Sequence, residues 1–236
     1  MILNKKEIVT IKKKLYDYID KSCIFRCEPN TKYNYCSDKG FITPKGTKNK
    51  NYSYQFYMRR LTHNPIALEW VSLLFLNDLI YKIKNNEEYE NIQLAGLETG
   101  SLPLLSALQM VSIKYNIYLN CFSVRKERKS YGLFNYIEGI PNDNYVILID
   151  DLINSGRTFY KCYDVIKHEL GNKLAKNSYC IVDIHDERTH IELEKDVIIQ
   201  SNYIFKSKEF DKKYNKEKYW FPKDCDKTYN KRPEYF

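Results

Sequence analysis

The chain has 236 residues, 43% of them hydrophobic, which fits one large domain or a domain with additions. No apolar run is long enough for a transmembrane helix, and the first residues lack the apolar core of a signal peptide, so we expect a soluble, cytoplasmic protein. The formal net charge of +8 favours an anionic partner, and a phosphorylated substrate would satisfy it as well as nucleic acid would.

The first third of the chain is predicted to contain two helices separated by an irregular region. Apolar residues three or four positions apart among lysines predict an amphipathic helix within residues 1–21. Asn64 followed by Pro65 is a favourable helix start, so a second helix should run to about Lys84. The side chains expected to face inward are Ile8, Ile11, Leu15 and Ile19 in the first helix and Ile66, Trp70, Val71, Leu74, Leu76 and Leu79 in the second. The short strands expected in the irregular region are 41–43 and 52–58.

Three cysteines in the irregular region, Cys23, Cys27 and Cys36, raise the question of a zinc site. A structural zinc site usually has four ligands in two close pairs. Here the spacings are four and nine residues, no fourth cysteine is near, and His63 is remote. The chain has seven cysteines, an odd number, so we expect free thiols instead of a metal site.

From residue 92 onward, apolar strands alternate with helices. The expected elements are strands at 92–97, 117–124, 145–149, 179–184 and 196–199, a helix at 102–115, and a helix that carries Phe159, Cys162, Tyr163, Ile166 and Leu170 on one face and closes at Gly171. This alternation predicts an α/β fold with a central, mostly parallel sheet flanked by helices.

Three polar segments follow predicted strands at the points where those strands end. We call them the Glu98 segment (residues 98–101), the Arg125 segment (125–139) and the Asp150 segment (150–158). In parallel α/β sheets, ligands bind beyond the carboxyl ends of the strands. The three segments should therefore converge on one site.

The Asp150 segment has the chemistry of a site for a polyol and a phosphate. Asp150 and Asp151 end a buried strand, where carboxylates are costly unless they are solvated, paired or used. Vicinal hydroxyl groups and Mg²⁺ are natural partners of such acids. The loop 154–158 then presents backbone N–H groups and hydroxyls at a helix N-terminus, which is a geometry that holds phosphate. The alternative is an acidic helix cap followed by a turn.

At this point the residues resemble a known family. LIDDLINSGRT, ending at Thr158, is similar to the ribose-5-phosphate-binding signature of type I phosphoribosyltransferases, with Asn154 where a small residue is usual. AGLETGSLPL, residues 95–104, resembles the pyrophosphate loop of the same family. FSVRKERKSYGLFNYIEG, residues 122–139, resembles the mobile catalytic loop of the orotate phosphoribosyltransferases. The resemblance covers about residues 40–190, in the order that the family shows.

The resemblance implies an enzyme that transfers ribose 5-phosphate from phosphoribosyl pyrophosphate to a nucleobase and releases pyrophosphate, with Mg²⁺ held mainly by the substrate. The family's loop closes over the site and reaches into the neighbouring subunit, which implies a homodimer with shared active sites. The implied catalytic residues are Arg125, Lys126, Lys129, Asp150 and Asp151, with the two acids as further candidate ligands of Mg²⁺. The implied substrate contacts are Asp150, Asp151, Asn154, Ser155, Gly156, Arg157 and Thr158 for ribose phosphate and Glu98, Thr99, Gly100 and Ser101 for pyrophosphate.

The base end of the site departs from the family pattern. Tyr131 stands where the family's loop has a histidine, and His185 stands where orotate enzymes place an arginine, with Arg188 three residues further on. Neutral histidine is a poorer partner for a carboxylate than arginine. The candidate base contacts are Phe56, Tyr57, Arg59, Tyr131, His185 and Arg188, with Arg60 as another possible anion contact. We expect an orotate-like pyrimidine, and another base stays open.

The family assignment divides the chain into three regions. Residues 1–63 are expected to form a helix and a hood with base contacts, residues 64–200 the core, and residues 201–236 a C-terminal extension. The tail 206–236 has ten basic residues against six acidic ones, with eight aromatics interleaved. It motivates an alternative, a phosphoribosyltransferase-fold regulator or effector that binds phosphoribosyl pyrophosphate and a nucleic acid or protein partner.

Overall fold

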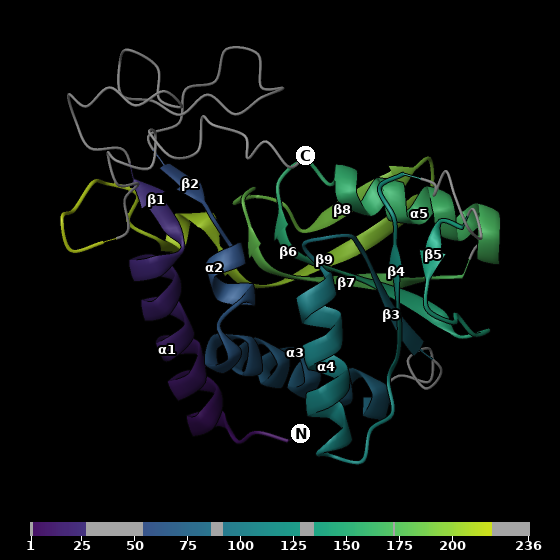
Figure 1. Cartoon of the computed structure of the whole chain (residues 1–236), viewed down its shortest axis with the longest axis horizontal. Helices are drawn as coiled ribbons and strands as arrows, with labels where there is room; N and C mark the ends of the chain where they lie inside the picture. Colours follow the sequence, from purple (N-terminus) through teal and green to yellow (C-terminus); the bar gives the residue numbers. More distant parts are fainter. Residues whose placement is uncertain (1, 27–53, 86–91, 128–134, 172, 219–236) are drawn as a thin grey trace, which may run out of the picture. The chain divides into compact units, whose positions relative to one another are not determined.

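The computed structural model describes residues 2–26, 54–85, 92–127, 135–171 and 173–218 (Figure 1). The chain divides into two compact units, which we describe separately. Unit 1 consists of Met1–Leu15 and Thr62–Glu209, and unit 2 of Tyr16–Leu61 and Phe210–Phe236. Helix α1 (Lys5–Ser22) begins in unit 1 and ends in unit 2.

A seven-stranded sheet forms the centre of unit 1 (Figure 1). The strands lie in the order β5-β4-β3-β6-β7-β9-β8, in which β5 and β8 pair antiparallel at the two edges and the other five are parallel. The strand bounds are β3 (Ile92–Leu97), β4 (Asn120–Val124), β5 (Ile137–Glu138), β6 (Tyr145–Ile153), β7 (Leu174–Asp183), β8 (His190–Glu194) and β9 (Val197–Lys206). The predicted α/β fold with a mostly parallel sheet is confirmed.

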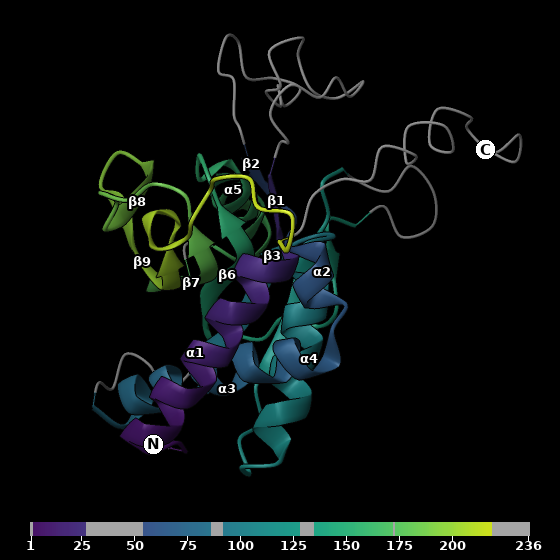
Figure 2. The same ribbon diagram turned by 90° about the vertical axis from the view of Figure 1, so that its left-hand side faces the viewer.

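Helices cover both faces of this sheet (Figures 1 and 2). Helix α5 (Arg157–Leu170) lies on one face, and α3 (Pro65–Asn85) and α4 (Leu102–Ile113) lie on the other. The strands bury both faces, so β6 has an unbroken buried run, in which Val146 and Leu148 belong to the core on the α5 side. Such near-continuous apolar strands are typical of parallel sheets covered on both faces.

Most helix and strand positions agree with the sequence-based prediction. Helix α3 starts where predicted because the Asn64 side chain accepts a hydrogen bond from the Ala67 N–H at 2.9 Å, which caps the first turn. Gly171 has a φ of 75° and closes α5, as the sequence indicated. One helix residue was assigned to the wrong face, because the Ile66 side chain is 58% exposed.

Two strands, β6 and β9, extend further at their C-terminal ends than predicted. Strand β6 continues through both acids to Ile153, because β7 pairs with it as far as Asp183. Strand β9 runs to Lys206, so the core boundary expected at residue 200 falls inside a strand. The edge strands β5 and β8 were not predicted, since their pairing depends on neighbours distant in the sequence.

Unit 2 contains the end of α1, the antiparallel pair β1 (Ile24–Arg26) and β2 (Tyr54–Phe56), all of the helix α2 (Arg59–Thr62) except its last residue, and the residues from Phe210 on. The buried Arg26 side chain joins these pieces, since it donates to Asp20 Oδ1 at 2.5 Å and, through Nε, to Asp211 O at 2.9 Å. The strand expected at 41–43 lies outside the described residues. Among the residues that the structure describes, no helix combines the length and the apolar character needed to cross a membrane.

Gly96 in β3 offers a test of how tightly unit 1 is packed. An added Cβ would lie 2.3 Å from Ser101 Cβ and 2.5 Å from Ile149 O, so the backbone would have to shift. We expect Gly96→Ala to lower the free energy of unfolding by roughly 3 kcal/mol, the upper part of the range for overpacking. Thermal or urea unfolding followed by circular dichroism measures this.

A matched control for this substitution is Gly171→Ala. There the added methyl group meets nothing within 4 Å, and only the positive φ is unfavourable. We expect a loss of about 1 kcal/mol. An equal loss in both variants would contradict the packing that the structure shows at Gly96.

Candidate functional site

The two acids of the Asp150 segment lie side by side near the end of β6. The Asp150 side chain is buried, with the residue 5% exposed, and Asp151 is half-buried. The Asp151 N–H donates a hydrogen bond to Asp150 Oδ1 at 2.9 Å. Burial raises the pKa of Asp150 well above its usual range, and the neighbouring Asp151 charge raises it further. The pair therefore favours a ligand that brings hydroxyl donors or a cation.

The Glu98 segment lies directly against both acids. A Cβ added to Gly100 would be 3.3 Å from Asp150 Oδ1 and 3.4 Å from Asp151 Oδ1. Ser101 is buried behind this glycine, and its Oγ donates to Leu97 O at 2.7 Å. The end of β3 and the end of β6 therefore meet in one place, and a residue with a side chain at position 100 would crowd it.

The loop of the Asp150 segment forms a small hollow of about 80 Å³ at the start of α5. It is lined by Asp150 and by Asn154, Ser155, Gly156 and Thr158. Gly156 is the residue before the helix and has a φ of 80°, which favours glycine. A hydrogen bond from Thr158 to Asp150 links the loop to the acid. Backbone N–H groups at such a helix start attract anions.

The Arg125 segment is tied to the Glu98 segment through Glu98 itself. Arg125 Nη1 lies 3.6 Å from Glu98 Oε2 and 3.1 Å from Glu138 Oε1. The Lys126 N–H donates to Glu98 Oε1 at 3.1 Å. Glu98 thus contacts the guanidinium group of Arg125 and the backbone of Lys126. Lys129 and Tyr131, the two remaining candidates of this segment, lie outside the described residues.

The candidate base contacts fall into both units. In unit 1, His185 is exposed just after β7, and its N–H donates to Asp183 Oδ1 at 3.0 Å. Arg188 instead donates from Nη2 to the Asn154 carbonyl, so its guanidinium group contacts the loop of the Asp150 segment. The candidates in unit 2 are Phe56, which is buried, Tyr57, which is 42% exposed, and Arg59, which is exposed at the start of α2.

Two charged residues near the loop of the Asp150 segment were not singled out from the sequence. Asp183 ends β7 and Lys206 ends β9, and both side chains are almost completely buried. Each follows an apolar strand, as Asp150 does, and that shared pattern is the signal that could have found them.

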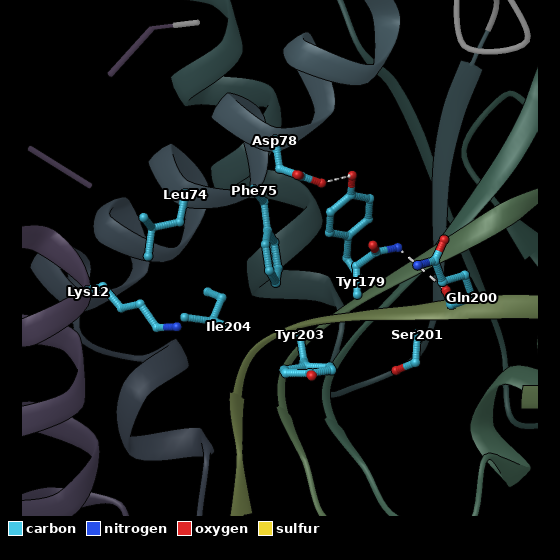
Figure 3. Close-up of a pocket in the computed structure, with 10 residues that line it drawn as sticks. Lys12, Leu74, Phe75, Asp78, Tyr179, Gln200, Ser201, Tyr203 and Ile204 are labelled. Carbon is cyan, nitrogen blue, oxygen red and sulfur yellow. Dashed lines mark hydrogen bonds between the residues drawn. The ribbon is translucent and has the colours of Figure 1, made fainter. Parts of the chain in front are cut away.

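A larger hollow of about 440 Å³ lies elsewhere in unit 1, between α1, α3 and β9, and it contains none of the predicted site residues (Figure 3). Its polar side chains bind one another, since the Tyr179 hydroxyl donates to Asp78 Oδ2 at 2.6 Å and Lys82 Nζ lies 2.9 Å from the same carboxylate oxygen. The predicted residues of the Asp150 segment line the small hollow beside Asp150 and not this larger one.

The cysteine prediction can be followed only at Cys23, because Cys27 and Cys36 lie outside the described residues. Cys23 is a buried free thiol, and burial raises its pKa to about 12. Within the described part of the chain, no group of three or more His, Cys, Asp or Glu residues is placed to hold a metal ion.

Comparison with known proteins gives sequence relatives that include orotate phosphoribosyltransferases, although no family model matches the chain. Orotate phosphoribosyltransferase of Methanococcus maripaludis is 33% identical over 136 residues, which are 57% of this chain and 66% of that enzyme. Orotate phosphoribosyltransferase of Leptospira biflexa is 26% identical over 175 residues, which are 74% of this chain and 89% of that enzyme. The chain thus spans between about two thirds and nine tenths of these relatives.

Solved structures share the fold at lower sequence identity. A phosphoribosyltransferase from Corynebacterium diphtheriae superposes with a TM-score of 0.56 at 16% identity, covering 84% of this chain and 97% of that one. Orotate phosphoribosyltransferase from Aeropyrum pernix superposes with a TM-score of 0.52 at 21% identity, covering 72% of this chain and 87% of that one. At these identities the likeness is one of fold.

The raised pKa of Asp150 predicts how this acid affects stability. The folded state binds the Asp150 proton more tightly than the unfolded chain does. The stability that this proton contributes is complete below the usual pKa of about 3.9 and is lost as the pH rises through the raised pKa. Asp150→Asn removes the ionisable group. We expect it to raise the melting temperature of the ligand-free protein at pH 8 by about 2–4 °C, and by less at pH 5.

Differential scanning fluorimetry across pH measures this effect. The control is Asp164→Asn, because the Asp164 side chain on α5 is 59% exposed, and its melting temperature should hardly change. A lower melting temperature for Asp150→Asn at pH 8 would show that the acid is not destabilising in the empty site.

Proposed function

The chain belongs to the type I phosphoribosyltransferases, and on that premise we propose that it transfers ribose 5-phosphate from phosphoribosyl pyrophosphate to a nucleobase nitrogen, with release of pyrophosphate. The base we propose first is an orotate-like pyrimidine, because the relatives described above are orotate enzymes. The observation that carries the proposal is that Gly100 lies against both acids. A Cβ added to Gly100 would be 3.3 Å from Asp150 Oδ1 and 3.4 Å from Asp151 Oδ1. This contact supports the proposal because the segment that resembles the family's pyrophosphate loop lies against the acids that resemble its ribose contacts.

The acids and their loop would hold the sugar phosphate. The two vicinal ribose hydroxyls would donate to Asp150 and Asp151, which favours the ionised form of a buried acid. The phosphate would lie in the hollow at the start of α5, against the backbone of Ser155 and Gly156. Positive charge that develops on the ribose ring in the transition state would be stabilised by the same carboxylates.

The leaving pyrophosphate needs cations and backbone donors on its side of the site. Thr99, Gly100 and Ser101 would supply backbone groups, and Arg125, Lys126 and Lys129 would supply positive charge. Mg²⁺ usually binds proteins through one or two carboxylates together with substrate phosphates and water. Asp150 and Asp151 fit that donor set, and the bound ion would neutralise pyrophosphate charge.

Fewer observed contacts support the proposed base-binding residues than support the proposed sugar-phosphate residues. His185 stays a candidate because it is exposed immediately after β7, and Tyr131 stays one by its position in the loop. Phe56, Tyr57 and Arg59 stay candidates from unit 2. Arg188 is a weaker candidate, since its guanidinium group already binds the Asn154 carbonyl.

A homodimer is part of the proposal, and α4 supports it. This helix buries Leu104, Leu105 and Leu108 yet also exposes Met110, which is 67% accessible, and Ile113, which is 53% accessible. A helix with apolar side chains on both faces is usually covered on both. The described cysteines are free thiols, which fits the reducing cytoplasm that we also propose.

Turnover with a panel of bases tests the proposed reaction. With phosphoribosyl pyrophosphate and Mg²⁺, we expect pyrophosphate release to be fastest with orotate. Lys129→Ala should lower kcat by about 100-fold or more while the melting temperature stays within 2 °C, because the side chain acts on developing charge and not on packing. Lys195→Ala, at an exposed position near β8, is a matched control that should keep wild-type kcat. No product with any base would refute the enzyme, and faster turnover of uracil or hypoxanthine would refute orotate.

Mixing two inactive variants tests whether subunits share active sites. In a heterodimer of Lys129→Ala with Asp150→Asn, a loop that reaches the partner unites an intact Lys129 with an intact Asp150 in one of the two sites. After exchange of subunits we expect about a quarter of the wild-type rate. A mixture as inactive as its two components would mean that each loop serves its own subunit.

A further inference from the structure

A buried ion pair lies behind the loop of the Asp150 segment. We infer that Lys206 and Asp183 are positioning residues, which act through Arg188 to hold the phosphate-binding loop in its binding geometry. The inference rests on the proposed function, because it assigns these residues a purpose at the same site. It also replaces base recognition as the role of Arg188.

The Lys206 ammonium group binds two backbone carbonyl groups of the turn after β7. Its Nζ lies 3.1 Å from Asp183 Oδ2, 2.9 Å from His185 O and 2.5 Å from Arg188 O. An ammonium group has three donors, so these partners occupy all of them. The Lys206 side chain is only 6% exposed, so water does not compete for these bonds. The backbone at both His185 and Arg188 is therefore tied to the end of β9.

Asp183 completes the arrangement from the end of β7. Its side chain is fully buried, and it accepts hydrogen bonds from the His185 N–H at 3.0 Å and from the Ser201 hydroxyl at 3.2 Å. Arg188 Nε lies 3.9 Å from Asp183 Oδ1. A buried ion pair adds little stability over a well-packed apolar pair, but it specifies one geometry when all its hydrogen bonds are made. Its placement here fixes the direction in which Arg188 points.

Arg188 links the buried ion pair to the loop of the Asp150 segment. Its Nη2 donates to the carbonyl of Asn154, the loop residue just after β6. A Cβ added to Gly156 would lie 3.1 Å from Ile191 Cγ2 and 4.0 Å from Arg188 Nη1, so the loop lies directly on these two side chains. Because Arg188 holds the Asn154 carbonyl, the loop keeps the conformation in which Asn154, Ser155 and Gly156 line the hollow. Preorganised donors bind an anion better than donors that must be ordered first.

The two possible roles of Arg188 predict different kinetics. A base contact that is removed raises the KM for the base. A brace of the phosphate loop that is removed raises the KM and Kd for phosphoribosyl pyrophosphate and leaves the KM for the base nearly unchanged.

Lys82 provides a matched control for Lys206. Lys82 lies on α3, its side chain is 21% exposed, and it points toward the sheet. Its Nζ lies 2.9 Å from Asp78 Oδ2, 3.1 Å from the Tyr179 hydroxyl and 2.9 Å from Asn202 Oδ1 (Figure 3 shows the residues Asp78 and Tyr179). All its partners lie on α3, β7 and β9, away from the loop. Replacing Lys82 should remove contacts to β7 and β9, the strands that carry Asp183 and Lys206, without changing the proposed phosphate-binding loop.

The experiment compares Lys206→Met, Arg188→Ala and Lys82→Met with the wild type. It measures the Kd for phosphoribosyl pyrophosphate with Mg²⁺ by calorimetry, the KM for each substrate, kcat and the melting temperature. We expect Lys206→Met and Arg188→Ala to weaken phosphoribosyl pyrophosphate about 10-fold or more, as loss of a supporting contact commonly does. Lys82→Met should lower the melting temperature but keep this Kd within about twofold of wild type. Lys206→Arg should recover part of the affinity because it keeps a charged donor.

Each outcome decides between the alternatives. An equal loss of affinity in Lys206→Met and Lys82→Met, or a higher KM for the base alone in Arg188→Ala, overturns the inference. If Lys206→Met does not fold, Arg188→Ala on its partly exposed turn gives the same answer. A wild-type protein that neither binds phosphoribosyl pyrophosphate nor releases pyrophosphate refutes the proposed function itself, whereas an active wild type with unaffected variants refutes only the positioning role.

Discussion

Two adjacent carboxylates at the buried end of β6 impose the strongest constraint on unit 1. Asp150 is almost inaccessible and lies beside Asp151, and such acids are unfavourable out of water unless donors or a cation compensate them. The chain itself supplies the Asp151 N–H and the bond from Thr158. Sugar hydroxyls and a divalent cation would supply the rest. We therefore expect a ligand that brings such donors or a cation to stabilise the protein.

Two glycines let the neighbouring backbone come close to these acids. Gly96 leaves room for Ser101 at the start of α4, and Gly100 brings the loop after β3 against both carboxylates. A side chain at either position would push the loop after β3 away from the two acids. The likeness to phosphoribosyltransferases thus has a local physical cause, since the reaction needs both substrate halves within one contact distance.

Much of the fold was predictable because its signals are local. The bounds of β3, the start of α3 at its Asn64 cap and the end of α5 at Gly171 all follow from periodicity and capping chemistry. The length of β6 was not predictable, because the strand ends only where β7 stops pairing with it. The exposure of Ile66 was not predictable either. An apolar residue near a helix start can face the core or the solvent, and the packing of the rest of the unit decides which.

For the site, the sequence by itself determined which chemical groups are present and at which strand ends they stand. Paired acids and a glycine-containing loop predicted a site for a polyol and a phosphate. The resemblance of three segments to type I phosphoribosyltransferases then implied ribose phosphate and pyrophosphate. Only the tertiary structure decided what Arg188 and Lys206 contact. A long cationic side chain near a strand end can reach a ligand or a neighbouring loop, and the choice depends on which carbonyl and carboxylate oxygens the folded sheet brings within its reach.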